Sequence, residues 1–200
     1  MNVRAHWESV YRSEQDSEVS WTQPNPALSI MLIRESCEHG RIIDVGGGTS
    51  QLTRHLLDAG YSVAVLDISG AAIERARSQL GARAKAVQWI VADVTTQPEL
   101  GTFDVWHDRA VFHFLTGSAD RSAYRTLLGK TLPTGGHAII ATFAPKGPER
   151  CSGLEVRRYS GQELATELGG EFLLLKSVPE EHLTPSGQAQ SFQYSVFRRL

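Results

Sequence analysis

The sequence predicts an α/β sandwich of three layers around a seven-stranded, mostly parallel sheet. Short apolar runs rich in Val and Ile alternate with segments of helical period, which is the pattern of repeated βαβ units. Three consecutive glycines follow the first run directly, in IIDVGGGTSQL at 42–52. The last two runs are separated by turn residues and not by a helix, which predicts an antiparallel hairpin at one edge of the sheet.

Each element follows from a local pattern. The apolar runs are the expected strands: 41–45, 62–67, 86–91, 103–107, 137–143, 172–178 and 191–199. Apolar residues three and four apart mark the expected helices: 49–59, 70–80, 110–132 and 160–168. Ser160 with Glu163 has the pattern of a helix N-cap, and HLTPSGQAQ at 182–190 is the expected loop between the last two strands.

The residues before the first strand are expected to form a helical cap. Trp7 and Tyr11 are four residues apart, so a helix projects both from one face, and Trp21 is a third aromatic residue outside the βαβ units. Packing onto the sheet and closure as a lid over ligand and acceptor both explain them. Pro26 suits the first turn of a second helix that is expected to run to Cys37.

Length and composition bound the class of protein. The 200 residues suffice for one buried core, so we expect a single domain, with 1–38 as a helical lid or cap and 41–200 as the core. Twenty basic and 22 acidic residues give a net charge of −2, which disfavours nucleic acid and anionic membranes as partners. Two cysteines, no apolar leader and no apolar run near the roughly 20 residues of a membrane span predict a reduced, soluble, cytoplasmic protein without a metal site.

The three glycines indicate a ligand that touches the main chain. Gly46 and Gly48 would lie between a strand end and a helix N-terminus, where open α/β sheets bind ligands. A dinucleotide fingerprint needs a third glycine where Gln51 stands, and a phosphate-binding P-loop needs a Gly-Lys pair that is absent. A cofactor without a pyrophosphate is therefore expected, and an NAD-dependent oxidoreductase is a distant alternative.

Acidic residues end the next two strands. Asp67 could accept hydrogen bonds from both hydroxyls of a ribose, and Asp93 could accept one from an adenine amine. Each alone is more simply a solvated loop acid or a helix cap. Together with the glycines, the two acids predict an adenosine site.

These stretches resemble the class I S-adenosylmethionine-dependent methyltransferases over nearly the full length of the chain. The motifs that carry the resemblance are DVGGGTS at 44–50, LDIS at 66–69, ADV at 92–94, FDVWHDRAVFHFL at 103–115 and LPTGGHAIIATF at 132–143. The resemblance implies a Rossmann-like sheet with an antiparallel final strand, and S-adenosyl-L-methionine as the cofactor, with S-adenosyl-L-homocysteine as its product.

The same resemblance implies a set of cofactor-binding residues. Asp44 would orient the cofactor's amino group, and Gly46 and Gly48 would lie against its methionine portion. The further members of the implied set are Gly47, where many relatives carry a larger residue and where we expect a more flexible loop, Asp67 with Ile68 for the ribose, Asp93 with the backbone of Val94 for adenine, and Asp108.

A narrower resemblance concerns the acceptor. HWESVYRSEQDSEVSWTQPNPALS at 6–29, DRAVFHFL at 108–115 and CSGLEVRRYS at 151–160 are similar to bacterial proteins related to the citrate synthase lysine methyltransferase. That group commonly has an acidic residue, a basic residue and Gly after the fourth strand, followed by another acid. Here Asp108, Arg109 and Ala110 stand at the first pattern, with Ala in place of Gly, and His113 stands in place of the later acid. A small-molecule acceptor is expected first, because no added substrate domain is expected and the net charge is small, and a protein lysine is expected second.

Asp108 and His113 are the candidate catalytic residues. A histidine exchanges protons near neutral pH, so His113 is the candidate general base, unless its apolar neighbours bury it in the core. Asp108 is expected at the cofactor's methionine end. His107 is expected to be structural.

Five residues are the candidate substrate-binding set. They are Trp7, Tyr11, Trp21, Arg109 and Arg158. Arg109 is equally compatible with an ion pair to Asp108 or Asp104, and Arg158 lies in a loop after the fifth strand that is suited to acceptor specificity.

The expected activity is methyl transfer to an N, O or S atom. A non-catalytic sensor of S-adenosylmethionine or S-adenosylhomocysteine is the alternative from another class.

Overall fold

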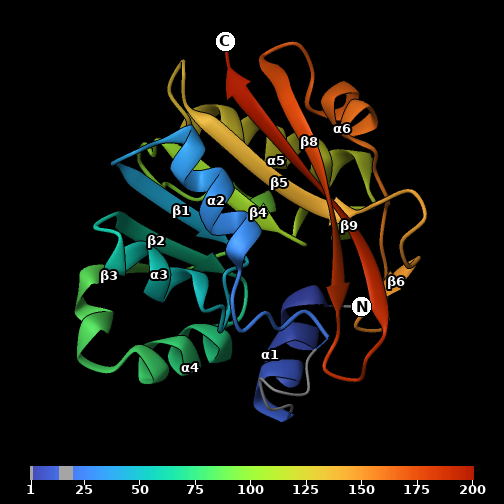
Figure 1. Ribbon diagram of the computed structural model, residues 1–200. Helices are drawn as coiled ribbons and strands as arrows, with labels where there is room; N and C mark the ends of the chain where they lie inside the picture. The colour runs from blue at the N-terminus through green and yellow to red at the C-terminus, as the bar shows by residue number, and fades with distance from the viewer. Residues whose placement is uncertain (1, 14–19) are drawn as a thin grey trace.

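The computed structural model describes residues 2–13 and 20–200, and its centre is a seven-stranded sheet in the order β3-β2-β1-β4-β5-β9-β8 (Figure 1). Its strands are β1 (Arg41–Val45), β2 (Ser62–Asp67), β3 (Val87–Val91), β4 (Val105–Arg109), β5 (His137–Phe143), β8 (Phe172–Leu183) and β9 (Ala189–Arg199). The pairs from β3 to β5 are parallel, and β9 runs antiparallel to both β5 and β8. The predicted sheet, including its antiparallel C-terminal strand, is confirmed.

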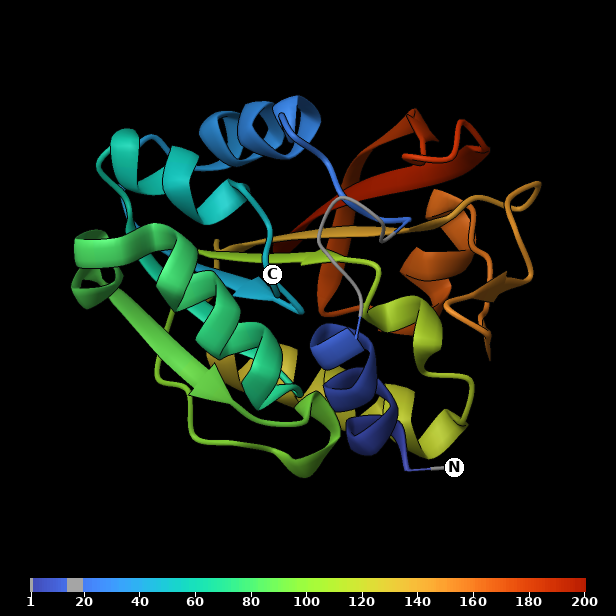
Figure 2. The same cartoon turned by 90° about the horizontal axis from the view of Figure 1, so that it is seen from below.

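Helices cover both faces of this sheet. The α-helices are α1 (Val3–Ser13), α2 (Ala27–Ser36), α3 (Leu52–Asp58), α4 (Gly70–Leu80), α5 (Ser118–Thr131) and α6 (Gly161–Leu168), and the short 3-10 turns are η1 (Gly81–Ala86), η2 (Val94–Thr96) and η3 (Phe112–Phe114). In Figure 2, α2 and α3 lie on one side of the sheet and α5 lies on the other.

Successive strand residues belong to two separate hydrophobic cores, one on each face of the sheet. Ile42 and Val105 pack with α2 and α3, whereas Ile43 and Trp106 pack with α5 and α6. This alternation follows from the pleat, which points neighbouring side chains to opposite faces. Both faces are buried, which explains why these strands are continuous apolar runs.

The predicted starts of one helix and one strand moved to positions where side chains bind nearby main chain. The helix expected at 49–59 begins at Leu52, after a turn in which the Ser50 hydroxyl accepts from the Leu52 amide at 3.1 Å. The strand expected at 103–107 begins at Val105 and runs to Arg109. Just before it, the Asp104 carboxylate accepts from the Arg41 amide at 2.8 Å.

The single helix expected over 110–132 was wrong. The Asp108 carboxylate accepts from the Val111 and Phe112 amides at 2.8 and 3.1 Å, which closes a turn directly after β4. Ala110 has φ +76°, a left-handed conformation that a helix cannot contain. The chain therefore forms η3 and starts α5 only at Ser118.

The C-terminal predictions hold and extend. The Ser160 hydroxyl accepts from the Glu163 amide at 3.3 Å and the Glu163 carboxylate accepts from the Ser160 amide at 2.7 Å, a complete capping box on α6. The predicted hairpin is longer at both strand ends and turns at Thr184–Gln188, where Thr184 donates to the Gln188 carbonyl at 2.9 Å. Inside the predicted loop after β5, β6 (Arg150–Cys151) and β7 (Leu154–Glu155) form a small hairpin.

At the N-terminus, α1 carries Trp7 and Tyr11 as expected, and Pro26 is the residue just before α2 instead of lying in its first turn. Figure 1 shows α1 below the arrowheads of the parallel strands. Part of the expected 1–38 cap, namely residues 1 and 14–19, lies outside the described residues. Within 2–13 and 20–200, no helix has both the length and the apolar character that crossing a bilayer requires.

Candidate functional site

The glycine loop, Gly46 to Gly48, lies at the carboxyl end of β1. Two of its glycines have backbone conformations that other residues rarely adopt. Gly46 and Gly48 have φ values of +67° and +45°. A Cβ on Gly46 would lie 2.1 Å from Val111 Cγ2, so the loop touches the turn after β4. Glycine is the residue that tolerates both the left-handed conformation and this close approach.

Gly47 is restricted by packing. A Cβ there would lie 2.7 Å from Asp44 Oδ2 and 2.9 Å from Val65 Cγ1, closer than real side chains approach. Flexibility alone was expected at Gly47, but the structure adds a steric requirement, because a side chain there would collide with Asp44 and Val65. The larger residue of many relatives would not fit here without moving Asp44.

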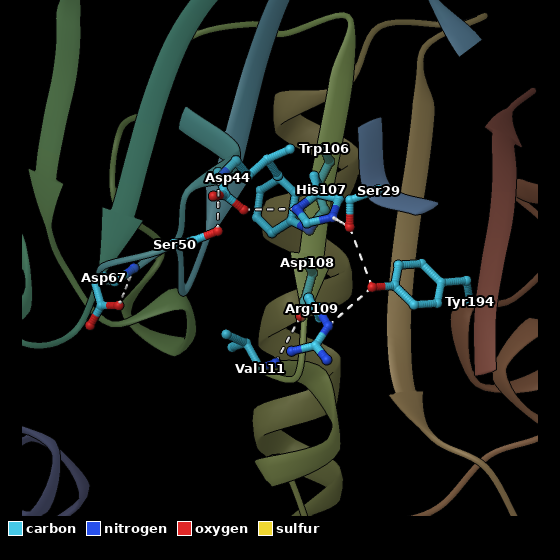
Figure 3. Close-up of polar contacts among 12 residues, drawn as sticks. Ser29, Asp44, Ser50, Asp67, Trp106, His107, Asp108, Arg109, Val111 and Tyr194 are labelled. Atoms are coloured by element: carbon cyan, nitrogen blue, oxygen red, sulfur yellow. Dashed lines mark hydrogen bonds and ion pairs between the residues drawn. The ribbon is translucent and has the colours of Figure 1, made fainter. Parts of the chain in front are cut away.

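Asp67 ties the first two loops of this edge together. Its Oδ2 accepts from the Gly48 amide at 3.0 Å and its Oδ1 from the Ser69 amide at 2.8 Å. Figure 3 shows the Asp67 side chain beside the glycine loop. Burial raises the pKa of Asp67 to about 6, although both hydrogen bonds lower it. Each oxygen keeps acceptor capacity for one more donor, such as a ribose hydroxyl.

Asp93 caps the turn that follows β3. Its Oδ1 accepts from the Thr95 amide at 2.8 Å and from the Thr95 hydroxyl at 2.7 Å. The helix-cap alternative is therefore correct for this residue, and the cap itself fixes the backbone of Val94, which is buried. A cap and an adenine contact are compatible, because a carboxylate has more acceptor sites than the cap uses.

Asp44 begins a chain of buried polar side chains that sequence reasoning missed. Its Oδ1 lies 2.8 Å from His107 Nδ1, and His107 Nε2 lies 3.0 Å from the Ser29 hydroxyl (Figure 3). That hydroxyl is 3.3 Å from the Tyr194 hydroxyl, which accepts from Arg109 Nε at 3.0 Å. The other carboxylate oxygen, Asp44 Oδ2, is buried and has no hydrogen-bond partner among the described residues.

Asp108 is a fully engaged acceptor. Besides the Val111 and Phe112 amides, it accepts from the Tyr124 hydroxyl at 2.6 Å. The side chain is completely buried, and this burial raises the pKa of Asp108 to about 6. The geometry gives Asp108 the role of shaping the turn that presses Val111 against the glycine loop, and a catalytic role stays a prediction.

His113 is packed inside the fold. Its ring lies 4.4 Å from the Phe114 ring and 4.8 Å from the Phe143 ring, and its Nδ1 accepts from the Phe143 amide at 3.4 Å. Burial, followed by the nearby Arg109 charge, lowers the pKa of His113 to about 3. An imidazole with that pKa is a weak proton acceptor at pH 7, so the geometry favours the packing alternative over a general base.

The predicted aromatic residues come together over the glycine loop. Trp7 contacts Trp21 and Phe114 at ring distances of 5.6 and 5.2 Å, and Tyr11 lies 6.1 Å from Trp21. A Cβ on Gly48 would lie 2.3 Å from the Tyr11 hydroxyl oxygen. Helix α1 therefore packs over the loop that the cofactor is expected to touch, and its closure as a lid stays a prediction.

Glu8 anchors this helix and was also missed. Its carboxylate accepts from the Gly70 and Ala71 amides at 2.6 and 3.3 Å, at the N-terminus of α4. The Arg75 side chain donates to the Tyr11 carbonyl and provides a second tie. Anions are stabilised at a helix N-terminus by its free amides, so Glu8 fixes where α1 sits.

The two candidate arginines are already paired. Arg109 has its acidic partner in Glu180, at 3.7 Å, and not in Asp108 or Asp104 as expected; it also donates to the Trp21 carbonyl at 3.1 Å. Arg158 pairs with Glu149 at 2.9 Å within its own loop. Arg109 thus lies beside the aromatic cover, whereas Arg158 is engaged in holding the loop after β5.

The sheet order, the glycine loop and the acids on adjacent strand ends have the arrangement of a Rossmann-like methyltransferase fold. Residues 42–136 match the family model described as "Methyltransferase domain". This stretch holds the glycine loop, Asp67, Asp93 and the turn after β4.

A curated relative, the eEF1A lysine and N-terminal methyltransferase of Danio rerio, is 24% identical over 144 residues, which are 70% of this chain and 21% of that protein. The chain thus spans about a fifth of that relative's length.

Two solved structures share the fold. One, from work on the conversion of a disulfide bond into a thioacetal group during echinomycin biosynthesis, has a TM-score of 0.81 at 22% identity and covers 99% of this chain and 92% of its own. The Burkholderia thailandensis 1,6-didemethyltoxoflavin-N1-methyltransferase, bound to 1,6-didemethyltoxoflavin and S-adenosylhomocysteine, has a TM-score of 0.73 at 18% identity, covering 98% of this chain and 87% of its own.

Proposed function

We propose that this domain transfers a methyl group from S-adenosylmethionine to an N, O or S atom of a small-molecule acceptor. The observation that carries the proposal is the free, buried Asp44 Oδ2 beside the glycine loop, next to the strand end that bears Asp67. A buried carboxylate oxygen without a partner is costly, and a cationic amino group is the donor that would satisfy it.

The residues present fit this cofactor. Asp44 would hold the amino group, the main chain of Gly46 and Gly48 would face the methionine portion, Asp67 would take the ribose, and Asp93 with Val94 would take the adenine. When bound, S-adenosylmethionine supplies an activated methyl group on a sulfonium. The remaining task of the protein is to hold the acceptor in line with that methyl group and to exclude water, an effect worth several kcal/mol of barrier.

A small acceptor is supported by the cover over the site. Trp7, Tyr11 and Trp21 pack together above the glycine loop, which suits a flat or aromatic molecule placed between them and the cofactor. Arg109 donates to the Trp21 carbonyl and is positioned to assist such an acceptor. The toxoflavin enzyme that shares the fold acts on a small molecule of that kind.

A protein lysine is the second candidate acceptor. It is favoured by the lysine methyltransferase relative and by the DRAVFHFL stretch at 108–115. The two acceptors separate in one experiment, since an assay with radiolabelled cofactor detects methyl transfer to protein in a cell extract and to its small-molecule fraction independently.

The first test is calorimetric titration with S-adenosylmethionine and S-adenosylhomocysteine. We expect micromolar binding that Asp67→Ala lowers by about 100-fold, because two loop amides and the ribose lose their shared acceptor. Asp58→Ala is the matched control. This substitution makes the same charge change, and Asp58 pairs with Arg83 on the surface. Absence of binding by the wild type would overturn the proposed function, and binding without turnover on any acceptor would favour the sensor alternative.

A further inference from the structure

The chain of polar side chains that begins at Asp44 has a role beyond packing. We propose that His107 is a positioning residue that selects for the amino acid end of the cofactor, by holding Asp44 so that Oδ2 faces the cofactor's amino group. The proposal rests on the proposed function, and it assigns to His107 a task that the adenosine-binding residues do not share.

The direction of the hydrogen bonds follows from the groups at the two ends of the chain. Arg109 can only donate, so the Tyr194 oxygen accepts from its Nε. A carboxylate can only accept, so His107 Nδ1 donates to Asp44 Oδ1 at 2.8 Å. With that proton on Nδ1, His107 Nε2 accepts from the Ser29 hydroxyl, and the Ser29 oxygen accepts from the Tyr194 hydroxyl.

The result is a carboxylate with one fixed oxygen and one available oxygen. His107 and Asp44 are each 2% exposed, so water does not compete for either group. The available oxygen lies against Gly47, where a Cβ would come within 2.7 Å of it. Without His107, the carboxylate could rotate and share its charge between other donors, and the amino group would lose a preorganised partner.

The adenosine end of the site is held independently. Asp67 is fixed by the Gly48 and Ser69 amides, and among the described residues it shares no hydrogen bond with the chain from Asp44 to Arg109, although the Asp44 and Asp67 carboxylates interact through their charges. A defect in His107 should therefore weaken ligands that carry the amino acid group much more than ligands that lack it. The two ends of the cofactor become separable in a binding experiment.

At its far end, the same chain of hydrogen bonds reaches the aromatic residues that pack over the glycine loop, Trp7, Tyr11 and Trp21. Arg109 donates both to Tyr194 and to the carbonyl of Trp21 (Figure 3 shows the Tyr194 contact). Tyr194→Phe should interrupt the chain without changing its packing, because the ring is fully buried and only the hydroxyl is removed. We expect a smaller effect from this variant than from loss of His107 itself, with the same preference among ligands.

The test compares two ligands that share adenosine and the thioether. S-adenosylhomocysteine carries the amino acid group, and 5′-methylthioadenosine lacks it. We expect His107→Leu to weaken binding of the first by about tenfold or more and of the second by no more than about twofold. His107→Asn should recover much of the loss, since its amide nitrogen can donate to Asp44 from nearly the position of Nδ1.

The ratio of the two affinities is an internal control for folding, because a damaged fold weakens the binding of both ligands. Equal losses for both ligands, or unchanged affinity for S-adenosylhomocysteine, would overturn the role of His107 and leave the proposed function standing. Failure of the wild type to bind either ligand would overturn the proposed function itself. A selective loss that Asn fails to recover would contradict the hydrogen bond to Asp44 as its cause.

Discussion

At the scale of single residues, the site is built by hydrogen bonds that hold the main chain in unusual places. Asp67 fixes Gly48, and Asp108 fixes Val111 and Phe112. Both carboxylates are buried, and burial raises the pKa of each to about 6. The protein therefore keeps two acids that are costly to ionise, because their oxygens position the loops that meet around Gly46.

Ala110 illustrates the cost of the turn after β4. Its φ of +76° lies in the left-handed region, which costs an L-residue about 1–2 kcal/mol. Glycine relieves that cost but loses about 0.5–1 kcal/mol through the greater freedom of the unfolded chain. Ala110→Gly should therefore raise the free energy of unfolding by about 0.5–1 kcal/mol, as measured by urea denaturation.

Ala76→Gly is the control for this prediction. Ala76 lies in α4, a regular helix, where glycine should lower the free energy of unfolding by about 0.5–1 kcal/mol. Opposite signs for the two substitutions would identify backbone conformation as the cause. Destabilisation by both would show that the packing of the Ala110 methyl group outweighs the strain.

At the scale of elements, α1 determines access to the glycine loop. The helix is tied to α4 by Glu8 and by Arg75, and these ties place Tyr11 over Gly48. A cofactor that touches Gly48 would need the Tyr11 side chain to shift. Movement of a small helix anchored by a few contacts is easier than opening of a packed core.

Removal of the Glu8 carboxylate should loosen α1 selectively. We expect Glu8→Ala to speed amide hydrogen exchange within residues 3–13 by about fivefold to thirtyfold, since two helix N-terminal amides lose their acceptor, an interaction worth about 1–2 kcal/mol. Exchange-coupled mass spectrometry measures this, and the strands of the sheet should remain protected.

Arg12→Ala provides the comparison. The Arg12 side chain is 77% exposed, and among the described residues its ion pair is with Glu8, at 3.6 Å, so its loss removes a surface ion pair of little energy. We expect nearly wild-type exchange in α1 for this variant. Equal exchange in the Glu8 and Arg12 variants would mean that the aromatic contacts of Trp7 and Tyr11, and not Glu8, hold the helix.

At the scale of the whole molecule, burial couples stability to pH. His113 has its pKa lowered to about 3 from 6.5, so below pH 6.5 the unfolded chain takes up a proton that the folded chain refuses. Its contribution to stability is complete above pH 6.5 and is lost as the pH falls toward 3. The limiting slope for one such group is about 1.4 kcal/mol per pH unit.

The effect of His113 on the pH dependence of stability is opposite in sign to that of the two buried acids. Asp67 and Asp108 hold protons more tightly when folded, so their effect lowers stability as the pH rises from 3.8 toward about 6. In urea denaturation from pH 4.5 to 8, the free energy of unfolding of His113→Leu should rise relative to that of the wild type as the pH falls below 6.5. The difference between the two proteins should be constant above pH 7. A constant difference over the whole range would show that His113 titrates alike in both states.

Much of the fold is visible in the sequence because its signals are local. The run before Gly46 predicts β1 with its observed bounds, and Ser160 with Glu163 predicts the cap of α6. The 110–132 segment misled because its apolar spacing is helical, while the turn is imposed by Asp108, whose acceptor role depends on burial. His113 was undecided for the same reason, since apolar neighbours indicate a core without showing which side chains it encloses.

The sequence by itself determined the sheet, the glycine loop, the strand-end acids and the terminal hairpin, since each depends on residues a few positions apart. Tertiary structure decided the partners of Asp44 and Arg109. The links from His107 to Asp44 and to Ser29 span 63 and 78 residues, and that from Arg109 to Tyr194 spans 85. Such contacts exist only after distant strands and α2 have packed together, and that packing also excludes the water that would otherwise satisfy these groups.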